Sequence, residues 1–63
     1  MARFVFSDNE TVTIENSVES KQFYYFTVED KEPDDGIATI LVTLAQLETL
    51  AKGILAYVAK ERS

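Results

Sequence analysis

The chain has 63 residues, a length that allows one domain, residues 1–63, with no room for a second core. It contains neither cysteine nor histidine, which excludes disulfides, thiolate zinc sites and catalytic triads built on histidine. Its formal net charge of −5 disfavours direct binding to the phosphate backbone of a nucleic acid.

The first predicted elements are two strands, residues 2–6 and 11–15, which form the arms of a hairpin. Both segments carry β-branched or aromatic residues, the types that favour a pleated sheet. Residues 7–10, Ser-Asp-Asn-Glu, supply the turn between them, and residues 16–20 form a second polar break.

The strongest strand signal covers residues 21–29, where aromatic and β-branched side chains run almost without interruption. A charged loop containing Pro33 and Gly36 follows, and residues 37–42 form a fourth, apolar strand. Because the connections between the first three strands are short, neighbouring strands are expected to pair antiparallel. The sequence therefore predicts a meander of four strands.

An amphipathic helix is predicted over residues 44–61, directly after the fourth strand. Thr43 and Gln46 have the spacing of a capping box at its start. Gly53 interrupts the helix, and either a close approach to an aromatic ring such as Phe26 or simple tolerance would explain it. Apolar residues spaced three and four apart form one stripe: Leu47, Leu50, Ala51, Ile54, Leu55 and Val58.

Side-chain alternation divides the predicted sheet into two faces. The richer face contains Phe4, Phe6, Val12, Ile14, Tyr24, Phe26, Val28, Ala38, Ile40 and Val42. We expect the helix to pack on this face, which gives an α+β fold of the order ββββα.

The other face is predicted to be an oligomer contact, because charge is nearly absent from it and a wet antiparallel sheet normally carries polar residues. A second copy stacked sheet on sheet, a homodimer, is the simplest cover. A mildly apolar wet sheet and a register slip of one residue, which exchanges the faces, are the alternatives. The residues expected in the contact are Val5, Phe23, Tyr25, Ile37 and Leu41.

One dense cluster of carboxylates lies in the loop after the third strand, and it is the predicted partner-binding site: Glu29, Asp30, Glu32, Asp34 and Asp35. Compared with a calcium-binding EF-hand loop, Gly36 comes one place late and Leu41 stands where a bidentate glutamate is needed. The pattern therefore favours a solvated acidic loop, and we expect no metal and no cofactor.

These features predict a small, acidic, non-enzymatic protein-interaction module, an inhibitor or regulator that presents carboxylates to a partner protein. The alternative is a structural or assembly subunit whose second sheet face is a permanent oligomer contact. The apolar stretches are too short to cross a bilayer and no secretory signal is visible, so we expect a cytoplasmic protein that binds neither membrane nor nucleic acid.

Overall fold

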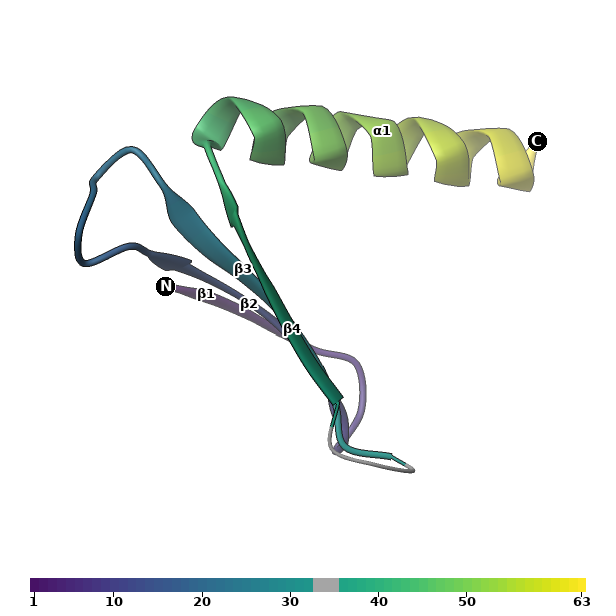
Figure 1. Cartoon of the computed structure of the whole chain (residues 1–63). Coiled ribbons are helices and arrows are strands. Elements are labelled where there is room, and N and C mark those ends of the chain that lie inside the picture. Colours follow the sequence, from purple (N-terminus) through teal and green to yellow (C-terminus); the bar gives the residue numbers. More distant parts are fainter. Residues whose placement is uncertain (33–35) are drawn as a thin grey trace.

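The computed structural model describes residues 1–32 and 36–63, which form one four-stranded sheet and one helix (Figure 1). The elements are β1 (Ala2–Val5), β2 (Glu10–Asn16), β3 (Tyr24–Asp30), β4 (Gly36–Val42) and α1 (Leu44–Arg62). The strands lie in the order β1-β2-β3-β4, and all neighbours pair antiparallel. The predicted ββββα meander of the α+β class is therefore confirmed.

The turn between β1 and β2 is stabilised by local hydrogen bonds. The backbone N–H of Phe6 donates to the carbonyl oxygen of Glu10 at 2.9 Å, and Ser7 Oγ accepts from the N–H of Asn9 at 3.2 Å. A serine oxygen that accepts from the N–H two residues on is a common turn geometry. Because Phe6 joins this turn, β1 ends one residue before the predicted strand does.

Serines also shape the connection between β2 and β3. The N–H of Ser17 donates to the carbonyl oxygen of Phe23 at 2.9 Å, and Ser20 Oγ accepts from the N–H of Gln22 at 3.2 Å. Residues 21–23 therefore lie in the turn, and β3 begins at Tyr24 rather than at the predicted Lys21. The strand propensity of this segment is overridden by local side-chain hydrogen bonding.

The register defines two faces, because residues directly opposite each other in paired strands point to the same side. We name the side toward α1 the inner face, and it contains Ala2, Phe4, Glu10, Val12, Ile14, Asn16, Tyr24, Phe26, Val28, Asp30, Gly36, Ala38, Ile40 and Val42. The opposite side is the outer face, with Arg3, Val5, Thr11, Thr13, Glu15, Tyr25, Thr27, Glu29, Ile37, Thr39 and Leu41. The predicted division of the strand residues is confirmed.

The junction between β4 and α1 consists of one extended residue, Thr43, at φ −93° and ψ 167°. Thr43 Oγ1 accepts from the N–H of Gln46 at 3.2 Å, and the N–H of Thr43 donates to Gln46 Oε1 at 2.9 Å. These two bonds complete the predicted capping box. With no loop at the junction, the helix leaves the end of β4 as a projecting arm (Figure 1).

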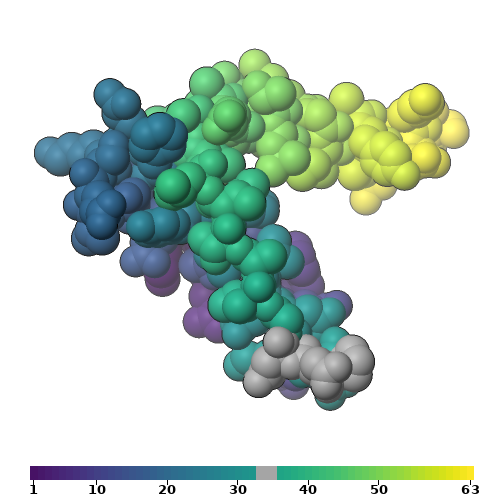
Figure 2. Space-filling view, viewed as in Figure 1, coloured from purple at the N-terminus to yellow at the C-terminus, as the bar shows by residue number. Residues whose placement is uncertain are grey.

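The helix lies over the inner face, as predicted, but it stands away from the sheet along most of its length. All of α1 is described, and none of its residues is buried. Among the described residues, Val42 is the one apolar residue that is buried. The space-filling view shows the helical arm diverging from the sheet, and the molecule measures 42 × 33 × 15 Å along its principal axes (Figure 2).

Gly53 does not mark a close approach to Phe26, the first of the two explanations expected from the sequence. A Cβ atom added at Gly53 would meet no atom within 4 Å among the described residues. Within the single chain, this glycine is therefore a tolerated interruption of the helix.

Candidate functional site

Two turns meet at the end of the sheet that is distant from the β4–α1 junction. The N–H of Lys31, just after β3, donates to the carbonyl oxygen of Asn9 in the β1–β2 turn at 2.9 Å. Glu10 lies directly opposite Asp30 in the β2–β3 ladder. The two turns together form a surface that we name the acidic end, with Asp8, Glu10, Glu29, Asp30 and Glu32.

The predicted acidic site is only partly a single cluster. Glu29 is half-buried on the outer face, opposite Thr11, whereas Asp30 and Glu32 are exposed. Asp30 Oδ1 accepts from the N–H of Glu32 at 3.0 Å, so this carboxylate also shapes its own loop. Two further members of the predicted site, Asp34 and Asp35, lie outside the described residues.

Asp8 and Glu10 belong to the acidic end but were missed by the sequence analysis, which treated the loop after the third strand alone. In an antiparallel meander, the first and third turns lie at the same end of the sheet. The predicted meander topology was therefore sufficient to place Asp8 and Glu10 of the first turn beside the predicted acidic loop. Among residues 1–32 and 36–63, no three acidic side chains are grouped closely enough to hold a metal ion.

The predicted oligomer residues mostly share the outer face. Val5, Ile37 and Leu41 are exposed there, Tyr25 is half-buried, and Phe23 precedes β3 in the turn.

The outer face is more polar than the sequence indicated. The register adds Arg3, Glu15 and Glu29 to it, and Thr27 Oγ1 lies 3.0 Å from Thr39 Oγ1, within hydrogen-bonding distance. Charged side chains and a threonine pair give this face several groups that water can solvate.

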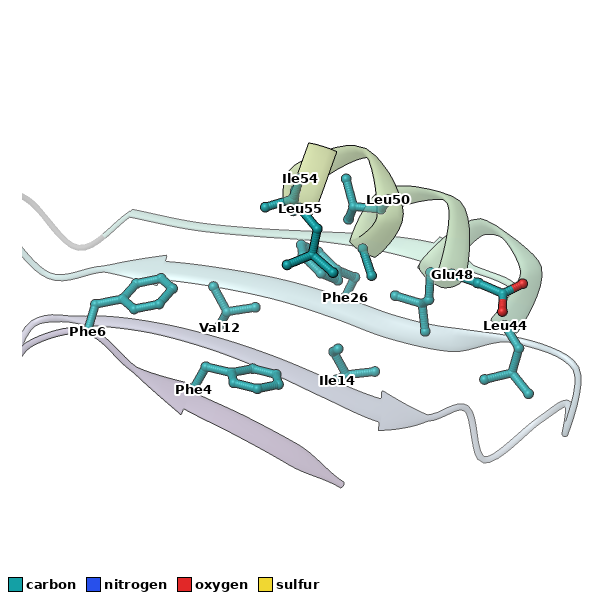
Figure 3. Close-up of a pocket in the computed structure, with 12 residues that line it drawn as sticks. Phe4, Phe6, Val12, Ile14, Phe26, Leu44, Glu48, Leu50, Ile54 and Leu55 are labelled. Atoms are coloured by element: carbon teal, nitrogen blue, oxygen red, sulfur yellow. The ribbon is translucent and has the colours of Figure 1, made fainter. Parts of the chain in front are cut away.

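A long apolar groove lies between the inner face and α1, with a volume of about 780 Å³ (Figure 3). Figure 3 shows Phe4, Val12 and Ile14 on the sheet below the helix, and Leu50, Ile54 and Leu55 on the helix above them. We name it the apolar groove, and its lining residues are Phe4, Phe6, Val12, Ile14, Phe26, Leu44, Leu47, Glu48, Leu50, Ala51, Ile54 and Leu55.

The groove contains one charged residue, Glu48, at its helical side. Its Oε2 lies 3.9 Å from Lys52 Nζ, which is the exposed i,i+4 pair that the helical spacing favours. Nearly all of these apolar residues were predicted to form the core between helix and sheet. In the structure the two layers stand apart, and the residues between them are open to solvent.

Comparison of the chain with family models, with curated proteins and with solved structures finds no match. Within the part of the chain that the structure describes, no helix combines the length and apolar character needed to cross a bilayer. Three surfaces of the described chain are candidates for function: the acidic end, the outer face and the apolar groove.

Proposed function

We propose that the protein is a small, non-enzymatic interaction module that binds a basic surface of another protein through its acidic end. The observation that supports this is the hydrogen bond from Lys31 to Asn9, which joins two turns distant in sequence. This bond brings both turns to one end of the sheet, where Glu10 and Asp30 lie directly opposite each other and Glu29 points to the outer face. The role that we propose for such a surface is that of a regulator or inhibitor. The location that we propose is the cytoplasm.

Charge makes this proposal specific. Residues 1–43 contain nine acidic and three basic side chains, whereas residues 44–63 contain two acidic and three basic ones. The negative charge is therefore concentrated on the sheet half of the chain. A surface of this kind steers a cationic partner toward it and repels anionic ones, and salt weakens both effects.

The test is capture of proteins from a host lysate, followed by charge reversal at the acidic end. We expect Glu29→Lys with Asp30→Lys to abolish capture of the main bound protein, and raised salt to weaken its capture by the unmodified chain. The matched control is Glu19→Lys with Glu61→Lys, which makes the same change in net charge away from the acidic end. Equal capture by both variants would contradict the proposal.

A second candidate function is a structural subunit that assembles through the outer face. It is favoured by the exposure of Val5, Ile37 and Leu41, three aliphatic side chains on one side of the sheet. In that case Leu41→Glu should dissociate the assembly without loss of the sheet, as measured by sedimentation and circular dichroism. An unchanged mass would remove this candidate.

A further inference from the structure

The single chain exposes far more surface than a compact chain of its size. Its accessible area is 5383 Å², whereas a folded monomer of 7.1 kDa exposes about 4,100 Å². The radius of gyration is 13.5 Å, against about 11 Å for a compact domain of this length. The excess area is about 1,300 Å² per chain.

The apolar groove contributes to this exposure, because the helix and the inner face leave apolar side chains such as Phe4, Ile54 and Leu55 half or more exposed. Stable domains bury such faces between at least two packed layers. In this arrangement the chain's own helix leaves the groove open: Thr43 is the one residue between β4 and α1, and its two capping bonds with Gln46 fix the start of the helix.

We propose that the apolar groove is the interface with a second copy of this chain, in which the helix of each copy packs on the inner face of the other. Each chain offers one uncovered sheet layer and one uncovered helical layer, so two copies related by a two-fold axis supply what each lacks. Burial of the excess area of both copies would remove about 2,600 Å² from water, within the range of permanent dimers. This inference concerns a different surface from the acidic end and does not depend on it.

Charge also favours a second copy as the occupant. The helical half carries Lys52, Lys60 and Arg62 against Glu48 and Glu61, a formal charge of +1, whereas the sheet half carries −6. Packing the helix of one chain on the sheet of another therefore brings opposite net charges together. Sheet-on-sheet stacking would instead bring two strongly negative halves together.

The direct test is nuclear magnetic resonance on a mixture of isotope-labelled and unlabelled chains, which reports contacts between chains only. We expect intermolecular contacts between the methyl groups of Ile54 or Leu55 and the ring of Phe4 or Phe26. Contacts between copies at Ile37 and Leu41 instead would overturn the proposal. So would a monomer, whether it stays free or binds a different protein in the groove.

A pair of neighbouring helix residues provides the matched substitution. Leu55 lines the groove and is 70% exposed in the single chain, and Ala56 is also exposed but does not line it. We expect Leu55→Glu to weaken dimerisation by about 100-fold or more, because it places a carboxylate in an apolar interface. Ala56→Glu should leave the mass in solution unchanged.

The outcome is decisive even if the variant does not fold. If the protein is a monomer with this structure, Leu55→Glu should not destabilise it, because the side chain of Leu55 is already largely exposed to solvent. Dissociation or unfolding of Leu55→Glu, with Ala56→Glu unaffected, supports the dimer. An unchanged mass and stability of Leu55→Glu would overturn it.

Discussion

The inner and outer faces of the sheet are similarly open to solvent in the single chain but differ in what they offer to water. Two rows of the inner face are apolar across all four strands, one with Phe4, Val12, Val28 and Ala38 and the other with Ala2, Ile14, Phe26 and Ile40, whereas the acidic pair Glu10 and Asp30 lies at one end. The corresponding row on the outer face is Arg3, Thr13, Thr27 and Thr39. The exposed fractions of the side chains therefore do not distinguish the two faces, whereas the residue types that the strand register places on each face do.

This difference changes which face of the sheet is expected to be covered by a partner. The outer face was expected to require a partner because the helix would already cover the inner one. In the structure, the helix stands away from the sheet, and the inner face has fewer groups along its apolar rows that can hydrogen-bond to water. A sheet can keep one wet face if that face carries polar groups, and here the outer face has them.

The largest expected effect comes from adding a charge at neighbouring positions of β1. Phe4 lies on the inner face and is 50% exposed, and Val5 lies on the outer face and is 61% exposed. We expect Phe4→Glu to dissociate the proposed dimer and to lower the unfolding free energy by about 3 kcal/mol or more, and Val5→Glu to change it by less than about 1 kcal/mol. Sedimentation and chemical denaturation measure both quantities. Equal effects would remove the distinction between the faces.

A gentler comparison uses truncation on β4. Ile40 on the inner face and Leu41 on the outer face are 59% and 56% exposed in the single chain, which makes them a matched pair. If the inner face is covered, Ile40→Ala should cost about 2–3 kcal/mol of unfolding free energy, whereas Leu41→Ala should cost less than about 1 kcal/mol. Denaturant titration distinguishes these results. A larger loss for Leu41→Ala would favour the outer face as the contact.

The position of the helix relative to the inner face depends on its cap. Thr43→Ala removes the hydroxyl that accepts from the N–H of Gln46, and it should lower the unfolding free energy by about 1 kcal/mol. Thr43→Ser keeps the hydroxyl and is the control, with an expected loss below about 0.5 kcal/mol. Thermal unfolding followed by circular dichroism gives the difference. Equal stability of the alanine variant and the unmodified chain would show that the cap does not hold the junction.

The smallest effect is expected on the helix side that faces away from the groove. Gly53→Ala should raise stability by up to about 1 kcal/mol, because alanine is the better helix former and its Cβ meets open space. The mass in solution should not change. A loss of stability would mean that a partner approaches the helix at Gly53, on the side opposite to the proposed interface.

Much of the fold follows from local chemistry. Strand residues such as Phe26, the capping pair Thr43 and Gln46, and the division of the strands into two faces were all predicted. The exceptions are Phe6 and the residues 21–23, where side-chain propensity favoured a strand but serine hydroxyls and backbone groups form turns instead. Intrinsic strand preference is weak enough for such bonds to override it.

The surfaces were harder to predict because they depend on how elements are placed in space. The acidic end needs Glu10 opposite Asp30, which follows from register rather than from proximity in the chain. The apolar groove arises because Thr43 alone joins β4 to α1, so a pattern typical of core becomes an open surface. Periodicity identifies which residues need to be covered, but it does not identify the chain that covers them.

Sedimentation equilibrium of the unmodified chain at tens of micromolar is the most direct measurement of whether a second copy covers the inner face. We expect twice the 7.1 kDa mass of one chain, with no detectable monomer. A mass of 7.1 kDa for a cooperatively folded protein would contradict the dimer, because the apolar groove would then be stable in water without a second copy.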